Sequence, residues 1–215
     1  MSPLFLRRVV QLPVGLVLCG AGIALMIRAA VGVSPWEVLA QGVSQQTGIA
    51  FGFVVNIVGA LVLLLWIPLR QRPGVGTVLN VMLIGPSAQL GLAIIPEQTE
   101  LWLQILVYAA GLVLLAIATG LYIGAGFGPG PRDGLMTGVH RRYGWPLWAV
   151  RTAIETVVLV IGWLLGGNVG VGTLAFALLI GPLVGRTLPM LRVPTASAPT
   201  ASAPTTAAQP AAVVG

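Results

Sequence analysis

The stretch Gly32-Val-Ser-Pro-Trp-Glu-Val-Leu39 shows how the chain is organised, because its pattern occurs again at Gly128-Pro-Gly-Pro-Arg-Asp-Gly-Leu135. Both stretches read glycine, two residues, proline, one residue, a carboxylate, one residue and leucine. Their first glycines are 96 residues apart (128 − 32), and at that spacing 25 of the 72 pairs between 15–86 and 111–182 are identical. The chain is therefore one unit used twice.

Glycine and proline carry the informative identities, since apolar matches are common by chance in so hydrophobic a chain. We expect two repeat domains, residues 1–96 and 97–193. A segment rich in Ala, Pro, Ser and Thr follows over 194–215, and its composition predicts disorder. The matched glycines and prolines include Gly42 with Gly138, Gly48 with Gly144, 74–77 with 170–173, and 83–86 with 179–182.

Composition places the chain in the lipid bilayer, which is its expected partner. The chain is 57% hydrophobic and 7% charged, with a mean hydropathy of +0.98. So few charges cannot cover the surface of a soluble domain. Eleven arginines against five acidic residues give the formal net charge of +6, but no polar domain gathers the arginines into a face that would bind nucleic acid.

Six apolar runs are long enough to cross a hydrocarbon core of about 30 Å as helices of about 20 residues. The segments 34–47 and 130–144 are too short and too polar to span, but each begins like a helix. Ser34 suits an N-cap and Pro35 a first helical position, and Gly48 and Gly144 suit helix ends. The predicted spans are 11–30, 50–69, 76–95, 101–122, 146–166 and 172–190.

Outside the predicted spans, arginine occurs only in alternate connections. It occurs before the first run and beside the ends of the second, fourth and sixth, whereas the other connections carry only glutamate. Positive residues stay inside, so we expect an inner (cytoplasmic) membrane protein with both termini cytoplasmic. Each unit holds three spans, so the second unit enters the membrane from the opposite side. The expected fold class is an all-α polytopic membrane protein, with six transmembrane helices in a 3+3 inverted repeat and one short non-spanning helix in each half.

The two Gly-rich breaks place helix N-termini inside the membrane, where free N–H groups favour an anionic group of a solute. An equally concrete alternative is that Glu37 and Asp133 cap their own helices. Arg28 either reaches the membrane interface or faces Glu37.

Charges inside membrane spans are costly and are functional candidates for that reason. Arg151 and Glu155 are four residues apart and can pair on one helix face, either as a structural pair or facing a cavity. Asn56 is either a site residue or an interhelical hydrogen-bonding group. The candidate substrate-binding residues are Ser34, Trp36, Glu37, Asn56, Arg132, Asp133, Arg151 and Glu155.

The stretch Gly32–Leu39, together with Gly-Val-Gly-Thr at 74–77 and the Gly-Pro at 85–86, resembles the YczE/YitT-like family of bacterial membrane proteins. The resemblance covers roughly residues 10–190 and implies a six-span integral membrane protein, without naming a substrate. In the second unit Arg132 replaces the tryptophan, so a role of Trp36 is not duplicated there.

Inverted repeats with helices interrupted by Gly and Pro are a recurring construction of secondary transporters. We therefore expect a permease for a small solute, with an anionic one favoured, that works by alternating access. The alternatives are a non-transporting scaffold or sensor subunit and, with less support, a channel. The sequence offers no nucleophile–base pair or metal-ligand spacing, so we expect no enzyme, cofactor or metal. It leaves open whether the chain forms a homodimer.

Overall fold

The computed structural model describes residues 3–193, which form eight helices and no strand. Residues 194–215, expected to be disordered, lie outside the described residues. The helices are α1 (Pro3–Arg28), α2 (Pro35–Thr47), α3 (Phe51–Leu64), α4 (Val75–Ile94), α5 (Leu101–Gly124), α6 (Pro131–Tyr143), α7 (Leu147–Leu164) and α8 (Val171–Leu191).

The helix starts repeat with the spacing found in the sequence. Helices α2, α3 and α4 begin at residues 35, 51 and 75, and α6, α7 and α8 begin 96 residues later, at 131, 147 and 171. The two short helices also end alike, because Gly48 and Gly144 both take left-handed C-cap conformations, with φ of 72° and 73°. The predicted short helices, with proline at the first position of each, are confirmed.

Five helices within residues 3–193 are long and apolar enough to cross a membrane, and a sixth span is reached if α2 and α3 count as one bent pair. The axes of that pair differ by 118°. The predicted span 50–69 is too long, because α3 ends at Leu64 after 14 residues. Beyond it the chain turns, and the buried indole of Trp66 donates to the carbonyl oxygen of Pro131 at 3.0 Å. A contact with the other half therefore follows the end of this helix.

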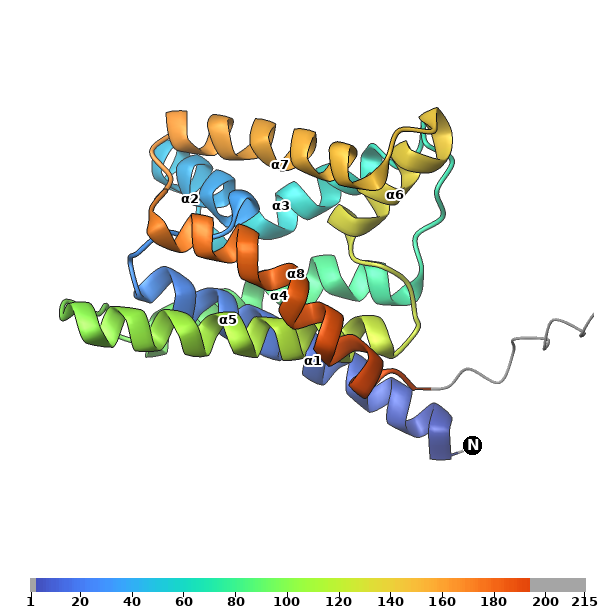
Figure 1. Ribbon diagram of the computed structural model, residues 1–215, viewed down its shortest axis with the longest axis horizontal. Helices are drawn as coiled ribbons and strands as arrows, with labels where there is room; N and C mark the ends of the chain where they lie inside the picture. Colours follow the sequence, from blue (N-terminus) through green and yellow to red (C-terminus); the bar gives the residue numbers. More distant parts are fainter. Residues whose placement is uncertain (1–2, 194–215) are drawn as a thin grey trace, which may run out of the picture.

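The helices form two layers (Figure 1). In one layer, α1 packs between α4 and α5, and α5 also packs against α8. In the other, α2 packs against α3 and α7, and α6 against the same two helices. Small residues allow α1 and α5 to approach closely, since a methyl group added at Gly22 would lie 3.0 Å from the carbonyl oxygen of Gly111.

Each Gly-rich break is held by the other half of the chain. The amide of Gly172 in α8 donates to the carbonyl of Val31 at 2.8 Å, and the amide of Gly76 in α4 donates to the carbonyl of Phe127 at 3.0 Å. The two bonds are equivalent in the repeat, because Val31 corresponds to Phe127 and Gly76 corresponds to Gly172. The glycine that follows each acceptor has a positive φ, 110° at Gly32 and 125° at Gly128, where other residues would be strained.

The two halves differ in how their third and fourth helices pack. Helix α3 packs along α4, and a methyl group added at Gly85 would overlap the side-chain oxygen of Asn56. Their equivalents, α7 and α8, scarcely touch. A methyl group added at Gly181 or Gly185 of α8 would meet nothing within 4 Å. The space between the layers is therefore closed on the α3–α4 side and open on the α7–α8 side.

The two Gly-Pro pairs do not interrupt their helices, because Pro86 and Pro182 lie inside continuous α4 and α8.

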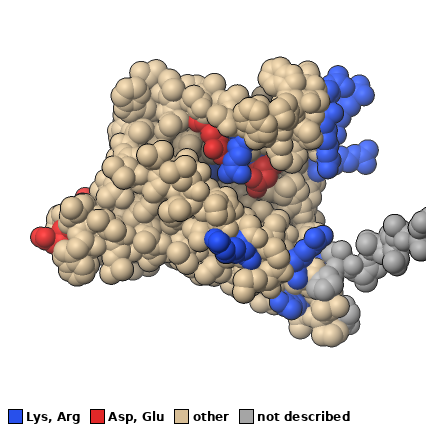
Figure 2. Space-filling view, in the orientation of Figure 1, with Lys and Arg blue, Asp and Glu red and all other residues tan. Residues whose placement is uncertain are grey.

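Charged side chains gather at the two ends of the molecule (Figure 2). Arginines lie at the end where α1 begins, and acidic residues lie at the opposite end, near the start of α5.

Candidate functional site

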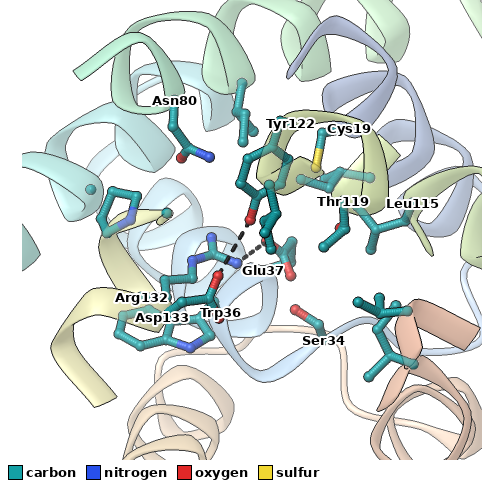
Figure 3. Close-up of a pocket in the computed structure, with 18 of the residues that line it drawn as sticks. Cys19, Ser34, Trp36, Glu37, Asn80, Leu115, Thr119, Tyr122, Arg132 and Asp133 are labelled. Carbon is teal, nitrogen blue, oxygen red and sulfur yellow. Dashed lines mark hydrogen bonds and ion pairs between the residues drawn. The ribbon is translucent and has the colours of Figure 1, made fainter. Parts of the chain in front are cut away.

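A cavity of about 420 Å³ lies between the two layers, and all eight helices contribute to its lining. Figure 2 shows acidic and basic side chains at the bottom of a hollow on the face where α7 and α8 diverge. The first turns of α2 and α6 both reach this cavity, so the two copies of the repeated stretch meet there (Figure 3). Its polar lining residues are Cys19, Ser34, Trp36, Glu37, Asn80, Thr119, Tyr122, Arg132, Asp133, Arg151 and Glu155.

An ion pair joins the two short helices. Nη1 of Arg132 lies 2.8 Å from Oε1 of Glu37, whose side chain is only 4% exposed. The guanidinium also lies over the ring of Trp36, 5.1 Å from its centroid. Glu37 stands in the first turn of α2, and the hydrogen-bond partner of its carboxylate is this arginine of the other half. Trp36 has an arginine as its repeat equivalent, and the structure brings these two unlike residues into contact.

Asp133 is held differently. Its Oδ2 accepts a hydrogen bond from the hydroxyl of Tyr122 at 3.3 Å, and among residues 3–193 no arginine nitrogen lies within 4.0 Å of its carboxylate. Gly130 sits at the centre of this group. A methyl group built on it would lie 3.1 Å from the Tyr122 hydroxyl, 3.4 Å from Oδ2 of Asp133 and 3.5 Å from Nδ2 of Asn80.

Arg151 and Glu155 form the expected pair on α7, with Nε and Oε1 at 3.0 Å. Both line the cavity. Their side chains are 47% and 21% exposed, so this pair is much less buried than Arg132 with Glu37. A partly exposed pair at this helical spacing contributes only about 0.3–0.5 kcal/mol to stability.

Ser34 and Trp36 are also among the buried residues with polar groups in the cavity lining. Ser34 is 2% exposed, and it makes no side-chain capping bond although it stands at the N-cap of α2. Trp36 is 6% exposed, and its Nε1–H has no hydrogen-bond partner within the described part of the chain. A buried donor without an acceptor is unfavourable, so this nitrogen can be satisfied by an acceptor on a bound molecule.

One candidate residue needs correction, and one open alternative is excluded. Asn56 does not line the cavity; its side chain packs where α3 crosses α4 at Gly85, so it belongs to the helix interface. Arg28 does not face Glu37. Its Nη1 pairs with Oε1 of Glu97 at 2.6 Å in the loop before α5, and its Nη2 donates to the carbonyl of Leu92.

Sequence reasoning missed Tyr122, Thr119, Cys19 and Asn80 as lining residues. The repeat gives a partial indication that Tyr122 and Thr119 have a special role. Both are polar, whereas the equivalent residues of the first unit, Met26 and Ile23, are apolar. Only the packing of α1 against α5 shows that these positions face the space between the layers.

These features define an all-helical integral membrane protein with a charged internal cavity, and sequence comparison agrees. The chain belongs to a family described as "Family of unknown function (DUF6198)", which residues 6–188 match. It is 34% identical over 177 residues to the "Uncharacterized membrane protein YczE" of Bacillus subtilis, covering 81% of this chain and 82% of that one. The YczE-like membrane family expected from the repeated stretch is thereby confirmed.

Two further relatives are similar. One is an "Uncharacterized protein" of Haemophilus influenzae, 37% identical over 165 residues, which cover 77% of this chain and 76% of that protein. The other is the "Uncharacterized protein YyaS" of Bacillus subtilis, 24% identical over 182 residues, with 83% and 90% covered. No solved structure shows a significant match.

Proposed function

We propose that the protein is a secondary transporter that moves a small solute across the bacterial inner membrane by alternating access of two inverted repeats. The observation that carries this proposal is the unequal packing around the cavity. Equivalent helices are closed together in one half, α3 on α4, and apart in the other, α7 from α8. If the halves exchange these arrangements, α7 closes on α8 and α3 separates from α4. The cavity then opens between α3 and α4 instead of between α7 and α8.

The same chain is able to adopt both arrangements because the two units have matching helices and matching breaks. Exchange requires little internal change in any helix and mainly alters contacts between them, which is how transporters built from inverted repeats operate. A scaffold requires neither a charged cavity nor this inequality. A channel needs a continuous path, whereas this cavity is closed by the α3–α4 contact.

Cysteine pairs placed at equivalent positions test the exchange directly. A Cβ atom at Gly59 of α3 lies 3.7 Å from Cβ of Val81 in α4, which suits a disulfide. The equivalent positions in the second half are Glu155 of α7 and Ala177 of α8. In a Cys19→Ala background, we expect Gly59→Cys/Val81→Cys to crosslink from the present state and Glu155→Cys/Ala177→Cys to crosslink from the exchanged state.

The readout is a gel-mobility shift or a mass change after mild oxidation in native membranes. The pair at 59 and 81 serves as the positive control for oxidation. Crosslinking at 59 and 81 with none at 155 and 177 under any condition would contradict alternating access. Formation of both disulfides would contradict the scaffold alternative, since a static protein occupies one arrangement.

The orientation part of the proposal rests on the distribution of arginine, with both termini facing the cytoplasm. Single cysteines at Thr99 and Pro73, which are exposed in the loops before α5 and α4, report the two sides in the same background. We expect Thr99→Cys to react with a membrane-impermeant maleimide in intact spheroplasts, and Pro73→Cys to react only after the membrane is opened. The reverse pattern would place the termini outside.

A further inference from the structure

The charges of the cavity do not balance. Three carboxylates (Glu37, Asp133 and Glu155) and two guanidinium groups (Arg132 and Arg151) line it, which leaves one net negative charge when all are ionised. Glu37 and Glu155 each pair with an arginine, at 2.8 and 3.0 Å. Within residues 3–193 the carboxylate of Asp133 has only the Tyr122 hydroxyl as a hydrogen-bond partner. Of the three cavity carboxylates, Asp133 is therefore the one without a direct ion pair in this part of the chain.

An anionic solute is disfavoured in this arrangement. Both arginines already bind carboxylates of the protein, so an anion would have to displace one of them. The N-termini of α2 and α6, expected to attract an anionic group, already carry Glu37 and Asp133 in their first turns. Burial raises the pKa of Asp133, and Arg151, Arg132 and the Tyr122 hydroxyl act in the opposite direction.

A second observation points to a bound molecule. Trp36 lines the same cavity, and its buried Nε1–H has no acceptor among residues 3–193. The walls between the polar groups are aliphatic and aromatic, from residues such as Val55, Ile84, Leu115 and Phe176. A ligand that satisfies all three features carries a positive charge, an apolar body and a hydrogen-bond acceptor.

We propose that the cavity binds a small organic amine whose ammonium group pairs with Asp133 and whose hydrogen-bond acceptor reaches the indole N–H of Trp36. The ammonium lies on the cavity side of the Asp133 carboxylate, near Tyr122 and Gly130, where a larger side chain at position 130 would crowd it. That the amine is the transported solute rests on the proposed function. That the cavity binds an amine does not depend on transport.

Binding to the purified full chain in detergent, measured by calorimetry, tests the assignment without any transport assay. The probes are aminoalcohols of increasing chain length, alkylammonium ions of matched length and alkyl carboxylates of matched length. We expect at least one aminoalcohol to bind, its alkylammonium analogue to bind more weakly, and the carboxylate to bind least. Preferred binding of carboxylates, or no binding of any amine, would overturn the assignment.

Variants locate the ammonium. Asp133→Asn keeps the shape of the side chain and its acceptor for Tyr122, and it should weaken aminoalcohol binding by about 10- to 100-fold, the effect of losing one charged hydrogen bond. Glu100→Gln removes the same charge at an exposed residue before α5 and should leave the affinity unchanged. Equal losses in the two variants would mean that only net charge matters, which contradicts a site at Asp133.

Gly130→Ala provides a second test that does not alter charge. The backbone of Gly130 has φ of −62°, which alanine adopts freely, and the added methyl group fills the space between Tyr122, Asn80 and Asp133. We expect this variant also to weaken aminoalcohol binding. Unchanged affinity would exclude this space as the ammonium site. Amine binding in the absence of 155–177 crosslinking would support the site and contradict the transport mechanism.

Discussion

Gly85→Ala is expected to destabilise the protein by about 1–3 kcal/mol, whereas Gly181→Ala, the same change at the equivalent position of the other half, is expected to be neutral or stabilising by up to about 1 kcal/mol. A methyl group at Gly85 overlaps the side-chain oxygen of Asn56 and the carbonyl oxygen of Gly52, so α3 and α4 must separate. At Gly181 the methyl group meets nothing within 4 Å, and alanine favours the helix.

Thermal unfolding in detergent, followed by fluorescence, measures the difference between the two variants. Because both are glycine-to-alanine changes in a helix one residue before proline, intrinsic helix propensity cancels in the comparison. Equal effects would mean that α7 and α8 are packed as closely as α3 and α4. If alternating access holds, Gly181→Ala should also slow the exchange, because the methyl group obstructs closure of α7 onto α8.

Arg132→Met is expected to be the most damaging charge change in the protein, at about 3–5 kcal/mol, because it leaves the carboxylate of Glu37 buried without its cation. The Glu37 side chain is 4% exposed, and its carboxylate accepts a hydrogen bond from Arg132. The double variant Glu37→Met/Arg132→Met should recover most of the lost stability, since an apolar pair replaces the ionic one without leaving a buried charge.

Arg151→Met is the matched control for this prediction. It breaks a pair of the same chemistry in the same cavity, but one whose arginine is 47% exposed, so we expect a loss below about 1 kcal/mol. Denaturant or thermal unfolding of the four proteins gives the comparison. A loss at Arg151 as large as that at Arg132 would show that burial does not govern these pairs, and failure of the double variant to recover would give the pair a further structural role.

Much of the architecture follows from local sequence. Hydropathy and helix length determine which segments can cross a bilayer, and glycine and proline determine where helices begin and end. For this reason the starts of the two short helices and their glycine C-caps were predicted correctly. The spacing of four residues was enough to predict the Arg151–Glu155 pair, because one turn of helix brings such side chains together whatever surrounds them.

An inverted repeat predicts that its two copies of a site-forming break line one cavity, as Gly32–Leu39 and Gly128–Leu135 do. The individual side-chain contacts between the halves, however, were beyond the reach of the sequence. Arg132 and Glu37 are far apart in the chain, and only the meeting of α2 and α6 at the cavity brings them together at 2.8 Å. Asn56 and Asn80 are both polar residues of apolar helices, but packing directs Asn80 to the cavity and Asn56 to the α3–α4 interface. The local pattern of apolar residues did not predict which of the two asparagines would face the cavity.

The sequence by itself determined that the protein is helical, resides in the membrane and is built from one unit used twice, because these properties depend on hydropathy and on backbone restrictions at glycine and proline. The tertiary structure alone decided that α3 closes on α4 while α7 stands apart from α8. Two units with the same pattern adopt unlike packings because helix association depends on which side chains meet across the interface. The same contacts pair Arg132 with Glu37. Within residues 3–193 they leave the carboxylate of the neighbouring Asp133 with a hydrogen bond from Tyr122 and no ion pair.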